Sequence, residues 1–322
     1  MPTPQLARGL FRHRVANAAL VLAVLGAVLI GSALITAAAK GPGASAGRHH
    51  LRQLAAVAQT RAGRAGGRAL PPPVGCRHCW RPALRERWQI QLSSTPKRPY
   101  PKVGLIEVDG FDTPARVVKA LRAATHGGGV VCYIDAGTWE NWRPDASRFP
   151  RSLLGQPDGS WAGERWLDIA RFPGALARIM ANRARMCKRK GFNAIDFDNV
   201  DGYTNSTGFH LTGAEQLRYD VFLANTAHRL GLAVALKNDL EQIPRLVKYF
   251  DFAVDEQCFQ YRECLSSQNG GFGLDEFTRA HKAVFDIEYR LKTRQFCPGA
   301  IRDRFNGLRK RLNLGPWSQA CR

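Results

Sequence analysis

The residues best suited to chemistry lie in the segment AIDFDNVDGYTN, which runs from Ala194 to Asn205. It begins like a buried strand and then places three carboxylates, at Asp196, Asp198 and Asp201, within six residues. Carboxylates buried side by side repel one another and lose hydration, so such a run is unfavourable inside a core. Such a run of carboxylates becomes favourable where the end of a strand leaves the core and lies in a polar site. Paired carboxylates in such a site can divide acid and nucleophile roles on a bound substrate.

Glu256 is the candidate second carboxylate, because it ends a later apolar strand. Alternation along the first strand places Ala194, Asp196 and Asp198 on one face. If that face points inward, Asp196 lies deeper, hydrogen-bonded or neutralised, and Asp198 lies nearer the mouth of the site. Glu256 can then face Asp198 across the substrate.

Polar side chains end most of the other apolar strands as well. The strand-end residues expected to bind substrate are Asp109, Asp112, Asp135, Asp196, Asp201, Lys237, Asn238, Asp239 and Glu288. One polar strand end is usually a solvated turn. Six in succession along the chain indicate the mouth of a shared site instead.

Short apolar strands that alternate with amphipathic helical segments position these residues. The strands are expected at Trp88–Leu92, Gly104–Val108, Val130–Ile134, Ala194–Phe197, Leu232–Leu236, Phe252–Val254, Ala283–Ile287 and Leu312–Leu314. The clearest helical patterns are Pro114–Ala124, Leu176–Lys190, Ala214–Leu230 and Ile243–Phe250. This alternation is typical of parallel βαβ units.

Eight such units in about 240 residues predict an α/β fold of the (β/α)8 class, a TIM barrel, in a single catalytic domain. Active sites in these barrels lie at the carboxyl ends of the strands, where the polar residues cluster here. A doubly wound open sheet is the alternative, but the first turn lacks the G-x-G-x-x-G loop of dinucleotide-binding folds.

Aromatic residues flank the predicted site. Tryptophans cluster in the long connection after the third strand, and tyrosines follow the strands that carry the carboxylates. Flat rings beside polar groups suit a sugar, so we expect Trp139, Trp142, Tyr203 and Tyr261 to contact substrate. Trp166, in the apolar run WLDI, is expected to pack on the core.

Other motif matches are weaker. Gly43–Gly47, GASAG, fits a nucleophile elbow but has no strand before it. Asp196-Phe-Asp198 has oxygen ligands that suit Ca²⁺ or Mg²⁺, so a metal-dependent hydrolase stays open. Cys76 and Cys79 resemble half a zinc site, but no second pair has matching spacing. We therefore expect neither a metal nor a cofactor.

The beginning of the chain is typical of an exported protein. Arginines precede the uncharged run Val15–Ala39, which ends in small residues. This predicts a secretory signal, although a run of roughly 20 or more residues also fits an uncleaved membrane anchor. Residues 1–39 are thus the expected signal or anchor, residues 40–79 an Ala/Gly/Arg-rich disordered linker, and residues 80–322 the barrel. The expected location is secreted or cell-surface.

The net charge of +21 comes mainly from this amino-terminal part. Up to Arg98 there are fifteen Lys and Arg and one acid, Glu86, which leaves a net charge of +7 for the remainder. Such a basic excess suits an acidic cell surface or wall. No aromatic residues interleave with the linker arginines, so nucleic acid is not an expected partner. We expect a monomer that contacts a membrane only through residues 15–39, if they are retained.

Eight cysteines in an exported chain predict disulfide bonds, although they allow 105 pairings. Cys258 and Cys264 bracket a short loop beside Glu256, so we expect them to pair. Cys132, on the third strand, and Cys187, on the following helix, form the second expected pair.

Several motifs also carry a resemblance to a known family. In chain order they are WQIQL, VDGFDTPA, CYIDAGTWENWRPDA, SWAGERWLDI, AIDFDNVDGYTN, GLAVALKND, FDFAVDEQC and VFDIEY. They resemble glycoside hydrolase family 114, the endo-α-1,4-polygalactosaminidases, over about Trp88 to Tyr289.

This resemblance implies a barrel that hydrolyses α-1,4-linked galactosamine polysaccharide with retention of configuration. It implies that Asp198 is the nucleophile and Glu256 the acid/base, with carboxyl groups about 5–5.5 Å apart. An acidic mouth suits this substrate, because unacetylated galactosamine carries an ammonium group. The alternatives are a non-catalytic carbohydrate-binding barrel and a metal-dependent polysaccharide deacetylase.

Overall fold

The computed structural model describes residues 69–125, 127–159 and 161–321. The predicted signal segment and the linker up to residue 68 lie outside the described residues. Pro71–Arg322 forms one compact unit that contains the strands and helices of the fold. None of the described helices combines the length and apolar character needed to cross a bilayer.

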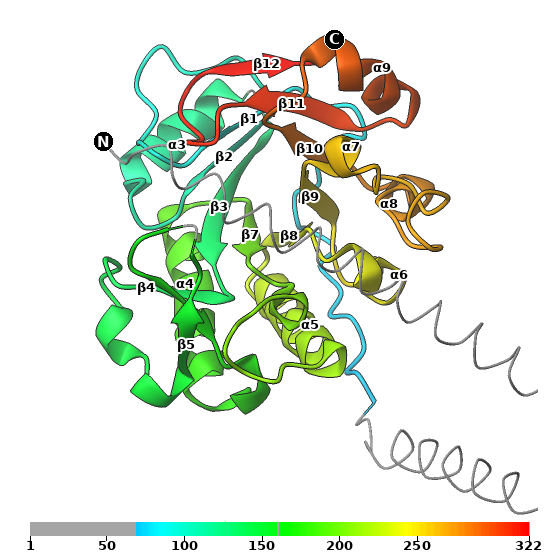
Figure 1. Cartoon of the computed structure of the whole chain (residues 1–322). Helices are drawn as coiled ribbons and strands as arrows, with labels where there is room; N and C mark the ends of the chain where they lie inside the picture. The colour runs from blue at the N-terminus through cyan, green and yellow to red at the C-terminus, as the bar shows by residue number, and fades with distance from the viewer. Residues whose placement is uncertain (1–68, 126, 160, 322) are drawn as a thin grey trace, which may run out of the picture. The chain divides into compact units, whose positions relative to one another are not determined.

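The unit is built on a barrel of parallel strands (Figure 1). Among the described residues, eight strands pair in parallel in the order β1-β2-β3-β7-β8-β9-β10-β11. Their bounds are β1 Trp88–Gln91, β2 Leu105–Asp109, β3 Gly129–Asp135, β7 Ala194–Asp198, β8 Ala233–Lys237, β9 Phe252–Glu256, β10 Val284–Glu288 and β11 Asn306–Lys310. The predicted TIM-barrel class is confirmed.

Helices lie between the strands along the chain. They are α3 Ala115–Ala124, α4 Gly174–Lys190, α5 Gly213–Arg229, α6 Ile243–Leu246, α7 Cys258–Tyr261, α8 Asp275–Arg279 and α9 Thr293–Arg302. Helix α5 begins with a capping box, in which the Thr212 hydroxyl accepts from the Glu215 backbone N–H and Glu215 binds the Thr212 N–H. Gly191 caps the end of α4, and its φ of 91° suits glycine.

Alternation along the strands decides what faces the barrel interior. Near the amino-terminal ends of the strands, the inward side chains form one apolar cluster that includes Trp88, Leu105, Ala194 and Phe252. The same inward faces become polar toward the carboxyl ends, since residues two apart on a strand share a face. The barrel is therefore apolar at one end and lined with ionisable groups at the other.

The predicted eighth strand is wrong. Leu312–Leu314 lies in a turn, and the eighth strand is β11, with the sequence NGLRK. Only Leu308 of this strand adds an apolar side chain to the core cluster. Lys310 is buried, and its ammonium donates to Gln89 Oε1 at 2.8 Å and to the Gly315 carbonyl at 2.6 Å. Hydrophobicity did not mark this strand because hydrogen bonds, more than apolar packing, hold it.

Side chains help close the barrel between β1 and β11. Strand β12, Ser318–Ala320, pairs antiparallel with β11 at the edge of the sheet. Asn306 Oδ1 accepts from the Glu86 backbone N–H at 2.8 Å, and Trp88 Nε1 donates to the Asn306 carbonyl at 2.8 Å. These bonds tie the first and last parallel strands together.

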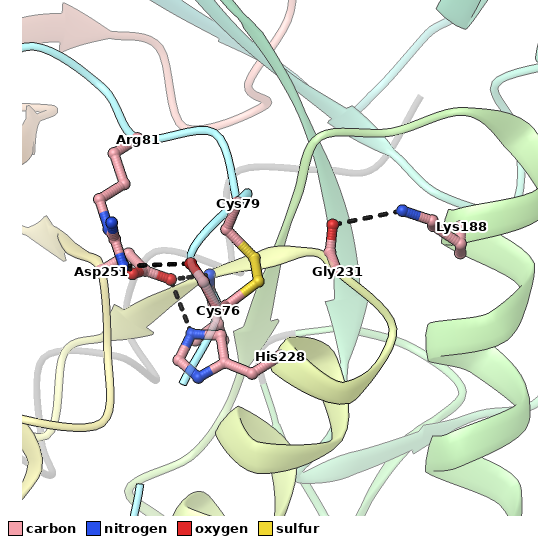
Figure 2. The surroundings of a disulfide bond; sticks show 8 residues. Cys76, Cys79, Arg81, Lys188, His228, Gly231 and Asp251 are labelled. Carbon is pink, nitrogen blue, oxygen red and sulfur yellow. Dashed lines mark hydrogen bonds and ion pairs between the residues drawn. A yellow bond between two sulfur atoms is a disulfide. The ribbon is translucent and has the colours of Figure 1, made fainter. Parts of the chain in front are cut away.

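The segment before β1 packs against the apolar cluster, and Figure 2 shows the disulfide that the segment carries. Cys76 and Cys79 form a disulfide, and Cys79 joins the apolar cluster. Arg81 Nε donates to Asp251 Oδ1 at 3.0 Å. Asp251 Oδ2 lies 2.8 Å from His228 Nε2 and accepts from the Val234 N–H at 3.0 Å. A buried carboxylate therefore anchors this segment to α5 and β8.

All eight cysteines lie in described residues, and they form four disulfides. Two of them, Cys132–Cys187 and Cys258–Cys264, confirm the predicted pairs. Disulfides persist in oxidising compartments and are rare in the cytosol. The protein therefore functions outside the cytoplasm.

Candidate active site

Lys237 joins the two predicted catalytic carboxyl groups. Asp198 ends β7, Lys237 ends β8 and Glu256 ends β9, so adjacent parallel strands bring the three side chains to one edge. Lys237 Nζ lies 2.9 Å from Asp198 Oδ1 and 3.7 Å from Glu256 Oε2. The distance between Asp198 Oδ1 and Glu256 Oε2 therefore cannot exceed the sum of these two distances. The two carboxyl groups thus share one site.

Three donors hold Asp198 as an anion. Its Oδ1 accepts from Lys237 Nζ and from the Asn199 backbone N–H, both at 2.9 Å, and its Oδ2 accepts from the Tyr133 hydroxyl at 2.7 Å. Burial raises the pKa of Asp198, but the Lys237 charge and these hydrogen bonds outweigh burial and leave the pKa below its ordinary value. The side chain keeps 17% of its surface exposed, so a substrate can reach it.

Glu256 has a different environment from Asp198. Its Oε1 accepts a hydrogen bond from the Tyr289 hydroxyl, and its side chain is 25% exposed. Its backbone N–H donates to Asn238 Oδ1 at 3.1 Å. Asn238 has a φ of 50°, in the left-handed region that Asn tolerates better than most residues. The ammonium of Lys237 lies closer to Asp198 than to Glu256, so it favours negative charge on Asp198.

Lys237 is itself buried, with 3% of its side chain exposed. Burial lowers the pKa of Lys237, but the carboxylates of Asp198, Glu256 and Asp196 outweigh burial and raise the pKa well above its ordinary value. The ammonium stands beside the carboxylates that a metal ion would need. The donor set therefore does not fit the Asp196–Asp198 metal site left open by the sequence.

A pair of buried carboxyl groups lies deeper in the barrel. Asp196 on β7 and Glu107 on β2 are both 0% exposed and interact with each other. Burial raises the pKa of Glu107 well above its usual range, and the nearby Asp196 charge raises it further. Burial also raises the pKa of Asp196, to about 7, against the opposing effect of Lys237. The deeper position of Asp196 agrees with the alternation along β7.

Asp135 at the end of β3 supports Asp198 through Asn199. It accepts from the Thr138 N–H at 2.7 Å and from Asn199 Nδ2 at 2.8 Å. Burial raises the pKa of Asp135 well above its ordinary value, with repulsion from Glu140 and Asp198 adding to it. Asn199 adopts a φ of 59°, and its N–H points to Asp198. Asp135 thus organises the backbone around the site rather than lying open to solvent.

Asp109 at the end of β2 is engaged in a similar way. Its carboxylate pairs with both terminal nitrogens of Arg143, at 3.1 Å and 2.7 Å. It also accepts from the backbone N–H groups of Phe111 and Asp112, which shapes the turn. Asp112 is exposed over 72% of its side chain and lies 3.8 Å from Arg143.

Asp239 and Tyr203 form a second polar group beside the mouth. The Tyr203 hydroxyl donates to Asp239 Oδ1 at 3.0 Å and lies 3.3 Å from Glu241 Oε2. Burial raises the pKa of Asp239 well above its ordinary value, and the Asp201 charge adds to the effect. The φ of Asp239 is 44°, in the left-handed region of the backbone. Asp201 is partly exposed and accepts from Asn205 Nδ2 at 3.3 Å.

Glu288 lies on the outer face of β10. Its Oε1 accepts from the backbone N–H groups of Phe259 and Gln260, at 2.9 Å and 3.1 Å. It therefore fixes α7, which carries Tyr261 and starts two residues after Glu256. Tyr261 is partly exposed. Alternation places Glu288 away from the barrel interior, so the structure does not bring it to the mouth.

The tryptophans divide between surface and core. Trp142 is 48% exposed, and Trp139 is partly exposed with its Nε1 donating to the Ala146 carbonyl at 3.0 Å. Trp139 lies on β4, Thr138–Glu140, which forms a small antiparallel sheet with β6, Glu164–Leu167, and β5, Leu154–Pro157. Trp166 is buried, as predicted.

A further group with metal-ligating atoms lies on the outer side of the barrel. Asp255, Asp286 and Cys258 place ligand atoms within 4.8 Å of one another. Cys258 is already bonded to Cys264, so its sulfur is no thiolate ligand. The group does not fit a metal.

Sequence reasoning missed four residues that shape the site, namely Glu107, Tyr133, Arg143 and Tyr289. Alternation marks two of them, since Glu107 shares a face with Asp109 and Tyr133 shares one with Asp135. The same rule places Tyr289 inward, two residues after Ile287 of the core cluster. Arg143 comes from a loop, where no periodicity indicates direction.

Comparison with known proteins agrees with this geometry. The family model described as glycoside-hydrolase family GH114 matches residues 72–322. The structure of Aspergillus fumigatus Ega3 in complex with galactosamine is similar, with a TM-score of 0.70 and 32% sequence identity, over 78% of this chain and 100% of that chain. No curated protein matches significantly.

The fold is also shared with a more distant structure. The glycoside hydrolase domain of PelA from Pseudomonas aeruginosa has a TM-score of 0.53 and 12% identity, over 73% of this chain and 98% of that domain.

Proposed function

The chain belongs to glycoside-hydrolase family GH114, and we propose that it is an exported endo-glycosidase that cleaves α-1,4-linked galactosamine polysaccharide with retention of configuration. That the protein is a glycoside hydrolase follows from the family. The substrate is proposed from the similar Ega3, whose structure contains galactosamine. The roles of nucleophile and acid/base are assigned to Asp198 and Glu256.

The unequal contact of Lys237 with the two carboxyl groups carries this assignment. Its ammonium lies 2.9 Å from Asp198 and 3.7 Å from Glu256, and the pKa of Asp198 is lowered. A retaining glycosidase needs one ionised carboxylate and one protonated carboxylic acid, about 5–5.5 Å apart. Lys237 Nζ contacts both carboxyl groups, which limits the distance between Asp198 Oδ1 and Glu256 Oε2 to the sum of its two contact distances. A separation of about 5–5.5 Å lies within this limit.

The reaction then takes two balanced steps. First, Asp198 attacks the anomeric carbon while Glu256 gives its proton to the departing glycosidic oxygen, so a bond to Asp198 forms as the glycosidic bond breaks. Second, Glu256 takes a proton from water, and the water oxygen displaces Asp198 from the anomeric carbon. Both residues return to their starting protonation states. Tyr133 and Tyr289 hold the two carboxyl groups in position through their hydroxyl hydrogen bonds.

Negative charge around the mouth suits a cationic polymer. Besides the two catalytic carboxyl groups, the loops that follow β2, β7 and β8 carry the accessible acids Asp112, Asp201 and Glu241. Unacetylated galactosamine carries an ammonium group, which these carboxylates attract. A neutral polymer gains nothing from this charge.

Incubation of the purified protein with α-1,4-galactosaminan, followed by mass spectrometry of the products, tests the proposal. We expect soluble oligosaccharides of several lengths, as internal cleavage produces, and the same rate in the presence of EDTA. Binding without cleavage would identify a carbohydrate-binding barrel instead. With a partly N-acetylated polymer, release of acetate from an intact chain, abolished by EDTA, would identify a metal-dependent deacetylase.

A further inference from the structure

A large groove lies on the side of the barrel, away from the residues of the mouth. Its volume is about 1380 Å³, and its walls come from the segments before β1 and β2, from α9 and from β12. Pockets for small ligands have roughly 300–1,000 Å³. The groove is therefore large enough for part of an extended chain.

The groove follows from an irregularity of the barrel. In a regular (β/α)8 barrel a helix follows each strand and covers its outer face. The described residues 92–104, between β1 and β2, contain no helix, and the short strand β12 follows β11 in place of one. Strands β1 and β11 lie next to each other where the barrel closes. The outer surface of this region is left to α9, β12 and a loop.

The walls of the groove are rigid and partly apolar. The disulfide Cys297–Cys321 fastens α9 to the end of β12. Pro298 and Ile301 of α9 line the groove together with Pro101 and Val103, and Ile301 is 42% exposed. A rigid apolar floor limits the entropy that a bound chain must remove from the protein.

The charge of the groove has one sign. Arg87, Lys102 and Arg294 line it and are exposed, and no Asp or Glu is among the lining residues. Arg309 adds a fourth cation, because its guanidinium lies 3.2 Å from Oε1 of the lining residue Gln319. The mouth of the barrel has the opposite sign. A ligand that the groove attracts is therefore not the polymer that the mouth attracts.

Trp317 adds a flat ring beside two arginines. It immediately precedes Ser318 of the lining, and the guanidinium groups of Arg309 and Arg311 lie 5.7 Å and 5.1 Å from its ring centre. Stacking on the ring holds these cations in place, and fixed guanidinium groups bind the carboxylates of an acidic sugar.

We propose that this groove binds a strand of anionic polysaccharide and so holds the enzyme on an acidic matrix, while the acidic mouth cleaves a cationic polymer. The amino-terminal segment of the chain is a poor occupant, because residues 1–68 contain nine Lys and Arg and no Asp or Glu. Like charges would repel that segment from the groove.

Binding of polygalacturonate to the full chain, measured by affinity electrophoresis at low and high salt, tests this proposal. The groove variant is Lys102→Glu with Arg294→Glu. The matched control is Arg116→Glu with Lys119→Glu, which changes the net charge equally on exposed positions of α3. Neither pair touches the residues assigned to catalysis.

We expect the groove variant to bind polygalacturonate about tenfold more weakly than the control variant, as the loss of two exposed ion pairs produces. Cleavage of soluble galactosaminan should be equal in both variants. The binding measurement uses no galactosaminan, so it does not depend on whether that substrate is correct. Equal binding by the two variants would overturn the proposal. Binding to anionic lipid vesicles without binding to polygalacturonate, or self-association lost only in the groove variant, would also overturn it.

Discussion

At the scale of single residues, Lys237 makes two chemically equal carboxyl groups unequal. Its ammonium contacts Asp198 more closely than Glu256, and the Tyr133 hydroxyl and the Asn199 N–H add to the stabilisation of the Asp198 anion. Without these partners, burial would dominate and raise the pKa of Asp198. The ionised state of Asp198, the proposed nucleophile, is therefore set by its neighbours rather than by its residue type.

Replacing Lys237 by Met tests this dependence. The pKa of Asp198 should rise, so the nucleophile should become ionised only at higher pH. The acidic limb of the profile of kcat/KM against pH should shift upward by about one unit or more, since one unit corresponds to about 1.36 kcal/mol of lost interaction. An acidic limb at the wild-type pH, with activity merely lowered throughout, would contradict the assigned role of Lys237.

Asp198 and Asp196 should respond differently to the same change. Asp198→Asn should remove nearly all turnover, by about 10⁴-fold or more, and leave the fold and oligosaccharide binding nearly intact, because it removes the group that forms the bond. Asp196→Asn should lower thermal stability as well as rate, since its fully buried carboxyl group interacts with Glu107. Measurements of substrate cleavage, oligosaccharide binding and melting temperature distinguish the effects of the two substitutions. Full activity in Asp198→Asn would defeat the catalytic assignment.

Much of the site could be predicted from the sequence because strand alternation is local. The positions of Asp198, Lys237 and Glu256 follow from where three apolar strands end. What each side chain contacts does not follow in the same way. Asp109 and Asp135 end strands just as Asp198 does, yet Arg143 and Thr138 engage them, and those partners come from loops whose direction no periodicity indicates.

At the scale of elements, the segment before β1 is fastened to the barrel by Asp251. Burial raises the pKa of this carboxyl group, but hydrogen bonds from His228, Arg81 and the Val234 N–H outweigh burial and lower the pKa below its ordinary value of 3.8. A lowered folded-state pKa contributes stability that is present above the unfolded-state pKa and is lost as the pH falls through the folded-state pKa.

Asp251→Asn should therefore lower the free energy of unfolding at pH 7 by about 1–3 kcal/mol, and the difference from wild type should shrink below about pH 4. Urea unfolding at the two pH values measures this. Asp112→Asn, which removes a carboxylate whose side chain is 72% exposed, is the control and should change stability little at either pH. A deficit that grows on acidification would contradict a lowered pKa of Asp251 in the folded state.

The disulfide Cys258–Cys264 positions the element that follows Glu256. Its loop is short, so its entropic stabilisation is only about 2–3 kcal/mol. Replacing both cysteines by Ser should lower kcat by about tenfold, because small displacements of catalytic groups are costly. The same change at Cys297 and Cys321 removes a disulfide remote from the mouth and should lower stability without lowering kcat. Equal kcat values in the two variants would argue against a positional role.

Elements with strong apolar character were predictable, and the last strand was not. Each of the first seven parallel strands carries at least two side chains from Trp, Val, Ile, Leu and Phe, whereas β11, with the sequence NGLRK, carries only Leu308. Its place is set by tertiary hydrogen bonds of Asn306 and Lys310, and by Gly307, where a Cβ would meet Cys321 and Phe296. Such constraints come from the closed barrel and leave no local pattern.

At the scale of the whole molecule, the opposed charges of the mouth and the side groove underlie our proposal that the enzyme cleaves one polymer while it is bound to another. Four disulfides fit this external setting, and the predicted signal in residues 1–39 would provide the export. Sequencing the amino terminus of the secreted protein should find a mature chain that starts near Lys40. Intact Met1 in a membrane fraction would indicate an anchor instead.

The anomeric configuration of the first products tests the central claim most directly. Hydrolysis of α-1,4-galactosaminan followed by proton NMR from the first minutes should show the α-anomer of the new reducing end before mutarotation, because two displacements at one carbon restore its configuration. First appearance of the β-anomer, or an unchanged polymer, would contradict Asp198 and Glu256 as nucleophile and acid/base of a retaining galactosaminidase.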